Sequence, residues 1–180
     1  EAALRLLGRA ARGSMRDALS LTDQAIAYGG GQLDEGVVRS MLGSVDRSHA
    51  AGLVQALAGR DAAAVLALVD QLRTQGLSAA ATLEETATLL QQMAVLQAVP
   101  DALDAADPDH ADALHLAPLL AADETQLLYS MLLQGRAELS LMSDEHAALT
   151  MVLLRFLAFP AAGEGPPVAV RALASSAAPK

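Results

Sequence analysis

Residues 13–31 read GSMRDALSLTDQAIAYGGG, and this stretch carries the start, the body and the end of one helix. Ser14 is a favoured N-cap residue, and Asp17, three positions later, can reach back to it as the partner in a capping box. The three consecutive glycines that follow Tyr28 end the helix. Between these signals the spacing predicts one buried face, which consists of Leu19, Thr22, Ala25 and Ile26.

The composition of the whole chain favours helices as well. Apolar residues make up 53% of the 180 residues but aromatic residues only 2%, because most of the apolar content is Ala and Leu. Ala and Leu are strong helix formers, whereas strands are enriched in β-branched and aromatic residues. We therefore predict an all-α fold. The expected helices span residues 2–12, 14–28, 34–41, 46–58, 61–75, 78–99, 124–134 and 145–159. Side chains that cap or start these helices are expected at Asp34, Asp46, Asp61, Ser78 and Ser143.

We expect a domain boundary near residues 43 and 44, where a short helix closes at Gly43 and the character of the chain changes. Residues 44–159 then carry enough helical segments for a bundle, with short helical turns in a loop at residues 101–121. From residue 160 the chain is rich in Ala, Pro, Gly and Ser. Residues 160–180 offer too little apolar surface to offset the entropy of ordering, so we predict a disordered linker there.

Charge is distributed unevenly along the chain. Residues 1–42 are neutral overall, whereas residues 43–159 carry five Arg against fifteen acidic residues, a net charge of −10. An acidic surface disfavours direct binding to a phosphate backbone, which needs clustered Lys and Arg. If the chain serves DNA, we expect it to do so through partner proteins.

The sequence lacks the familiar catalytic signatures. It has no cysteine, no G-x-x-x-x-G-K-[ST] phosphate loop, no G-x-S-x-G elbow and no H-E-x-x-H motif. His110 and His115 lie in an acidic segment, where a metal site is a minor alternative to a solvated polar loop. The pairs Glu84-Glu85 and Asp144-Glu145 are expected in the first turns of helices, where carboxylates favour the helix dipole. We predict no catalytic residue and no metal site.

The longest apolar runs fall well short of the roughly 20 residues that span a bilayer, and no signal peptide is visible. We therefore expect a cytoplasmic protein without membrane contact. The sequence begins at Glu1 inside a helical phrase, EAALRLLGRAARG, which favours a piece of a longer chain.

Arg16 departs from the usual placement of charges on a helix. It lies in the first turn, where the free N–H groups and the helix dipole already make the field positive. A cation is unfavourable there unless an anion joins it, so Arg16 and the helix N-terminus together outline an anion site. The alternative is an exposed arginine that pairs with Asp17 or with an acidic residue of a neighbouring element.

The stretch 13–31 resembles the second-sensor helix of the gamma/tau subunits of bacterial DNA polymerase III, the motor subunits of the sliding-clamp loader. Two later phrases, QLLYSMLLQGRAEL at 126–139 and TMVLLRFLAF at 150–159, are similar to the end of the third domain of these subunits. The resemblance covers residues 1–159 in order. The segment between these phrases is only loosely similar.

The resemblance implies a short helical remnant of a AAA+ lid domain at residues 1–43, followed by a helical collar domain for oligomerisation at residues 44–159. It also implies that Arg16 contacts the nucleotide phosphates in the intact parent, with ATP and Mg as cofactors there. The Walker motifs of the family's first domain are absent from these 180 residues. The chain alone is therefore expected to bind no cofactor and to hydrolyse no ATP.

The family's partners would be the other clamp-loader subunits, namely delta, delta-prime and further gamma/tau copies, bound through the collar. The sliding clamp and DNA would be reached only through the assembled complex. Apolar residues near the end are expected to form core or interface, and the sequence alone does not separate the two. They are Leu127, Leu128, Met131, Leu132, Leu153, Leu154 and Leu157.

Two alternatives remain at this point. The chain could belong to another clamp-loader-like AAA+ protein of the recombination-factor type, which would share the first helices. It could also be an unrelated helical adaptor, and Arg16 would then have no assigned role.

Overall fold

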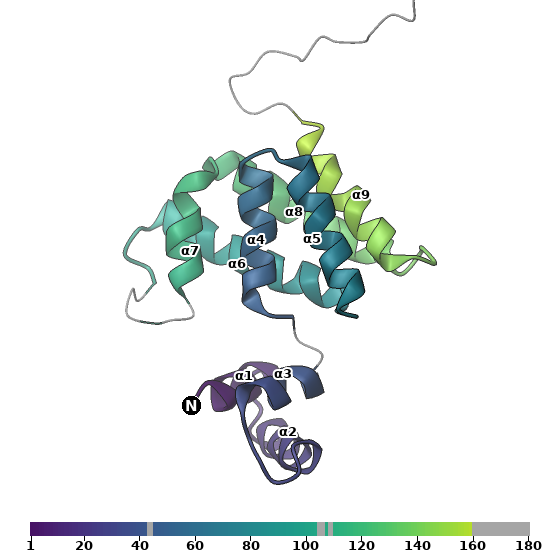
Figure 1. The fold of residues 1–180 in the computed structure, drawn as a ribbon. Coiled ribbons are helices and arrows are strands. Elements are labelled where there is room, and N and C mark those ends of the chain that lie inside the picture. The colour runs from purple at the N-terminus through teal and green to yellow at the C-terminus, as the bar shows by residue number, and fades with distance from the viewer. Residues whose placement is uncertain (43–44, 104–106, 108–109, 160–180) are drawn as a thin grey trace, which may run out of the picture.

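The computed structural model describes residues 1–42, 45–103, 107 and 110–159, and these residues form helices joined by short turns, without a strand (Figure 1). The prediction of an all-α fold is confirmed. The predicted linker at residues 160–180 and the predicted boundary at residues 43 and 44 lie outside the described residues. The helices are α1 (Ala2–Ala10), α2 (Met15–Tyr28), α3 (Glu35–Leu42), α4 (Arg47–Ala58), α5 (Ala62–Thr74), α6 (Ala79–Ala98), α7 (Ala111–Leu116), the 3-10 helix η2 (Ala117–Leu119), α8 (Ala122–Leu139) and α9 (Glu145–Leu157).

Most helices begin where local capping chemistry places their first turn. The predicted cap side chains each accept a hydrogen bond from a first-turn amide, at 2.8–3.2 Å; they are Ser14, Asp34, Asp46, Asp61 and Ser78. Such a bond satisfies one of the amides that a helix start otherwise leaves without a partner.

The expected cap of the last helix is wrong by one residue. Asp144, rather than Ser143, accepts hydrogen bonds from the amides of His146 and Ala147, both at 3.0 Å. These bonds, the Ala147 bond foremost, lower the pKa of Asp144 below its ordinary value. Both amides donate to the same oxygen, Oδ1, and the negative charge of the carboxylate makes these bonds stronger than bonds to a hydroxyl.

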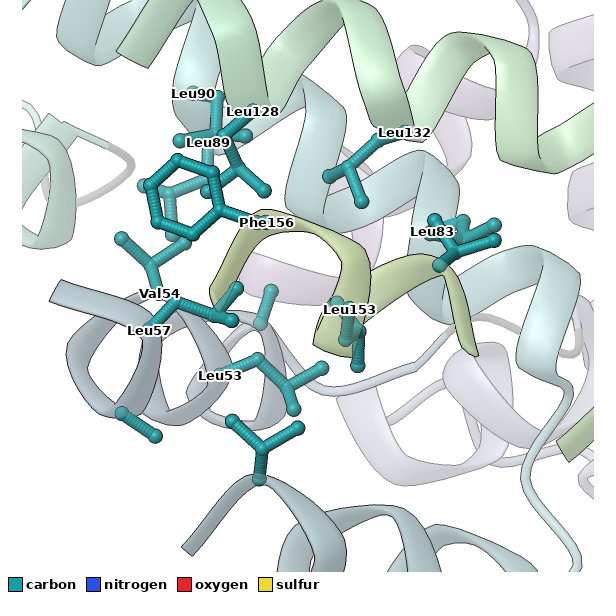
Figure 2. Close-up of a cluster of buried hydrophobic side chains, with 14 of the residues drawn as sticks. Leu53, Val54, Leu57, Leu83, Leu89, Leu90, Leu128, Leu132, Leu153 and Phe156 are labelled. Carbon is teal, nitrogen blue, oxygen red and sulfur yellow. The ribbon is translucent and has the colours of Figure 1, made fainter. Parts of the chain in front are cut away.

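The buried side chains form two separate clusters. The smaller cluster lies among α1, α2 and α3 and consists of Ala3, Leu6, Leu7, Ala25 and Val38. The larger cluster lies among α4–α9, with α6 in contact with α4, α7, α8 and α9. Figure 2 shows Phe156 of α9 in this larger cluster, among side chains that include Leu57 of α4, Leu90 of α6 and Leu128 of α8.

Polar side chains tie the ends of the larger cluster together. The amide nitrogen of Gln97 on α6 donates to the carbonyls of Ala117 and Leu120, both at 2.9 Å, which fixes the turn before α8. Arg60, in the turn between α4 and α5, pairs with Glu124 at 2.8 Å and lies 5.4 Å from the ring centroid of Phe156. These contacts hold the start of α8 and the end of α9 against the same turn.

The predicted buried face of α2 is wrong. Only Ala25 of that face is fully buried, while Leu19 and Ile26 are 60% and 42% exposed. Leu21 packs against the small cluster instead. The spacing shows that α2 has apolar residues on two sides, and α1 and α3 supply packing partners for only one of them.

Helix α8 is longer than predicted because Gly135 does not end it. The helix runs on to Leu139, and Gly135 is buried. A Cβ atom at this position would lie only 2.5–2.6 Å from the two Cγ atoms of Val152 on α9. The missing side chain therefore lets α8 and α9 approach closely, and the glycine marks a helix contact.

None of the helices in the described part of the chain is long and apolar enough to cross a membrane.

We expect Gly135→Ala to destabilise the larger cluster by about 1–3 kcal/mol, because the added methyl group overlaps Val152 and forces α8 and α9 apart. Chemical denaturation followed by far-UV circular dichroism measures this change. Gly52→Ala is the matched control, since a Cβ atom there would lie 3.6 Å from Leu68, an ordinary contact. The control should be neutral or stabilising by up to about 1 kcal/mol, as Ala favours helix interiors. Equal effects of the two substitutions would contradict the close approach.

Candidate functional site

The turn between α1 and α2 directs the start of α2 toward solvent. Arg12 and Gly13 both have positive φ, 49° and 83°, which reverses the chain after α1. Ser14 then caps α2 by accepting the amide of Asp17 at 3.2 Å. The reciprocal half of the predicted capping box does not form, because the amide of Ser14 donates to the carbonyl of Ala11 at 2.9 Å.

Arg16 lies at the second position of α2, and its side chain is exposed. Within the described residues no carboxylate lies within ion-pair distance of its guanidinium, so the expected alternative of pairing with Asp17 is not seen. The amides of Met15 and Arg16 precede the capped amide of Asp17, in a turn where helix geometry offers them no carbonyl. Free N–H groups, the helix dipole and one guanidinium can together bind an anionic group such as phosphate.

An apolar stripe runs along α2 from the same end. Met15, Leu19 and Ile26 are spaced at helical intervals and are 75%, 60% and 42% exposed. Three large apolar side chains on one exposed face favour contact with another protein surface. The exposed N-terminal end of α2, with Arg16, and this exposed apolar face thus lie on the same helix.

The seven residues that were predicted to form core or interface differ in their burial. Leu128, Met131, Leu132 and Leu153 are buried and belong to the core. Leu127 is 38% exposed, and Leu154 and Leu157 are partly buried. The sequence alone does not divide these residues, because helix periodicity does not show which neighbours cover a face.

Other exposed apolar residues of this cluster were missed from the sequence. Leu141 and Met142, in the turn between α8 and α9, are 82% and 53% exposed. Leu133 on α8 and Met151 on α9 are 49% and 63% exposed. The signal for the turn was available, since two large apolar residues stand between Ser140 and Ser143 where a turn usually has polar residues.

The remaining candidates have structural roles. Glu84 and Glu85 lie in the second turn of α6, not in the first as predicted, and they pair with Arg136 of α8 and Arg47 of α4. His110 directly precedes α7, and His115 lies in its last turn. Among the residues that the structure describes, no three His, Asp or Glu side chains gather into a group that could hold a metal ion.

Two known protein families match adjacent parts of the chain. The family described as DNA polymerase III clamp loader subunit, ATPase lid domain, matches residues 1–31. The family described as DNA polymerase III subunits gamma and tau domain III matches residues 33–171.

Several curated proteins are similar over most of the chain. The DNA polymerase III subunit tau of Escherichia coli K12 is 43% identical over 159 residues, which are 87% of this chain and 25% of that protein. The tau/gamma subunit of Haemophilus influenzae is 32% identical over 87% of this chain and 22% of its own length. The gamma subunit of Buchnera aphidicola from Baizongia pistaciae is 27% identical over 85% of this chain. The chain thus spans about a quarter of the length of the tau relatives that it matches.

We expect Ser14→Ala and Arg16→Ala to have opposite effects on α2. Ser14→Ala removes the cap of the Asp17 amide and should destabilise the helix by about 1 kcal/mol. Arg16→Ala removes a cation from the positive end of the dipole and should stabilise the helix by about 0.3 kcal/mol. Native-state hydrogen exchange of the α2 amides measures both changes. If the α2 amides of Arg16→Ala lose protection from hydrogen exchange, Arg16 stabilises the fold rather than serving ligand binding.

Proposed function

Because the chain belongs to the family of DNA polymerase III gamma and tau subunits, we propose that it works in the loading of the sliding clamp during DNA replication, as an assembly module with the end of an ATPase lid. The resemblance found in the sequence is confirmed by these matches. Neither alternative, the recombination-factor type or the unrelated adaptor, has support, since both matched families are DNA polymerase III clamp-loader proteins.

The observation that best supports a role in assembly is the exposed apolar turn that contains Leu141 and Met142. This turn lies on the larger cluster, whose core is already complete. Among the described residues, twenty-seven apolar side chains are buried in the larger cluster, including Phe156 and Leu132 at 1% exposure. The turn contributes nothing to that core, so its apolar surface is available to a neighbouring subunit. We assign residues 44–159 as the collar. Its partners are further gamma or tau copies and the delta and delta-prime subunits.

Residues 1–43 are proposed to be the end of the lid domain. In the longer protein, Arg16 and the first amides of α2 would contact the phosphates of ATP that is bound with Mg, and the exposed stripe of α2 would face the ATPase domain. The geometry supports this role, because the guanidinium is exposed and no carboxylate of the described residues pairs with it. Binding of ATP would then favour closure of the lid, and the collar would keep the subunits together.

DNA and the sliding clamp are proposed to be bound only through the assembled complex. The net charge of −10 over residues 43–159 opposes direct contact of the collar with a phosphate backbone. This part of the protein therefore serves DNA through its partners.

We expect the double substitution Leu141→Glu/Met142→Glu to weaken collar association by at least about tenfold and to leave the melting of the monomer unchanged. Both side chains are exposed, so new charges there cost little in the fold but must be desolvated in an interface. Sedimentation equilibrium at micromolar concentration, with and without partner collar subunits, measures the association.

The matched contrast is Leu132→Ala in the core, which should cost about 2–5 kcal/mol of stability. If the double variant associates as strongly as the wild type, this turn is not part of the interface. A wild-type chain that stays monomeric under both conditions would contradict the assembly role itself.

In a full-length gamma or tau protein, Arg16→Ala should impair ATP-dependent clamp loading about tenfold or more while subunit assembly stays normal. The reason is that one charge-assisted contact to phosphate is lost at the lid, far along the chain from α8 and α9. ATPase and clamp-loading assays measure the first effect, and gel filtration of the complex measures the second. Arg73→Ala is the control, because Arg73 is exposed on α5 and pairs with Asp144. Normal ATP affinity, ATPase and loading in Arg16→Ala would exclude a site at Arg16.

A further inference from the structure

The arginines of this chain fall into two groups. The described residues include ten arginines, and seven of them pair with carboxylates; these seven are Arg5, Arg39, Arg47, Arg60, Arg73, Arg136 and Arg155. The other three, Arg9, Arg12 and Arg16, lie within eight consecutive residues. Arg16 is accounted for by the proposed nucleotide contact, whereas Arg9 and Arg12 are not.

Arg9 and Arg12 both line an open groove of about 640 Å³, and Arg16 does not. The groove has walls from α1 and α3 on one side and from α6 and α8 on the other. Five arginines and two glutamates line it, a local net charge of +3 in a chain of net charge −9. Arg39, Arg47 and Arg136 have carboxylate partners, so Arg9 and Arg12 supply the uncompensated charge.

The groove is also partly apolar. Leu6, Leu42 and Leu133 line it, and Leu133 is 49% exposed although it is a large apolar side chain. A small inorganic anion would leave this apolar surface uncovered. A nucleic acid would be expected to stack its bases on aromatic side chains, and Tyr129 is the sole aromatic residue of the lining. A lining that carries both cationic and apolar side chains instead fits a peptide with both acidic and apolar side chains.

Carboxylates of this chain already bind next to the groove. Arg5 of α1 donates to Asp107 at 3.2 Å, and Arg47 pairs with Asp112 of α7 at 3.2 Å. These contacts show that arginines such as Arg47 of the groove lining can pair with side-chain carboxylates from another segment. We propose that the groove binds an acidic segment of a partner protein, with Arg9 and Arg12 pairing with its carboxylates and Leu133 contacting its apolar side chains.

The test uses the whole 180-residue chain and a fluorescently labelled 12-residue peptide of Glu, Asp and Leu, with binding measured by fluorescence anisotropy at low salt. The double substitution Arg9→Gln/Arg12→Gln should weaken binding by about tenfold or more, since two charge-assisted contacts are lost. Leu133→Ser should also weaken binding, and the factor by which it does so should be the same at low and at high salt. Arg9→Lys/Arg12→Lys should restore part of the affinity, because the charges return without the planar guanidinium.

Arg73→Gln/Arg155→Gln is the matched control. It removes the same number of positive charges from outside the groove, at the exposed Arg73 and the partly exposed Arg155, so it should change affinity by no more than about twofold. Far-UV circular dichroism of each variant checks that the fold is intact.

Four outcomes would overturn the proposal. The first is no binding of the peptide to the wild-type chain, and the second is unchanged binding after Arg9→Gln/Arg12→Gln. The third is tighter binding of a labelled 20-nucleotide poly-dT with the same dependence on Arg9 and Arg12, which would make the groove a nucleic-acid site. The fourth is equal binding of a control peptide with Gln and Asn in place of Glu and Asp, which would show that the carboxylates are not recognised.

Discussion

Burial of α6 is the constraint on which the larger cluster depends. Eight of its side chains are buried, and the helix contacts α4, α7, α8 and α9 (Figure 1). A helix that is apolar on several sides is stable only when neighbours enclose it. Its two buried threonines, Thr82 and Thr86, are tolerated because their hydroxyls donate to carbonyls one turn earlier, at 2.9 and 2.7 Å. The positions of the other helices follow from this need for enclosure.

Enclosure of α6 also decides which surfaces are left for function. The buried faces of α8 and α9 pack against α6 and against each other. The turn between them, with Leu141 and Met142, therefore has no role in the core. The smaller cluster has only five buried residues, so α2 keeps an apolar face toward solvent. In both clusters, apolar side chains therefore stay exposed beside a core that is already complete. Exposed apolar surface of this kind favours contact with a partner.

The sequence was sufficient for features that depend on neighbouring residues in the chain. Ser14, Asp46 and Asp61 could be identified as caps because a cap bonds to amides two or three residues away. Arg16 could be singled out for the same reason, as its position in the first turn fixes its relation to the helix dipole. Features that depend on another helix could not be derived, and the continuation of α8 through Gly135, which packs against Val152 of α9, is one of them. The buried side of α2 and the division between core and surface in α8 and α9 depend on tertiary neighbours in the same way.

The backbone conformation of Arg12 bears on the role of the arginines near it. Within the described residues two side-chain-bearing positions have positive φ, Arg12 at 49° and Arg60 at 54°, and this conformation costs about 1–2 kcal/mol for a residue with a Cβ atom. Arg60 offsets that cost within the fold, through Glu124 and the ring of Phe156. Arg12 makes no such contact, although glycine would fit its place in the turn at no steric cost. The fold therefore offers no contact that offsets the strain at Arg12, and this agrees with the proposed pairing of Arg9 and Arg12 with an acidic partner segment at the groove.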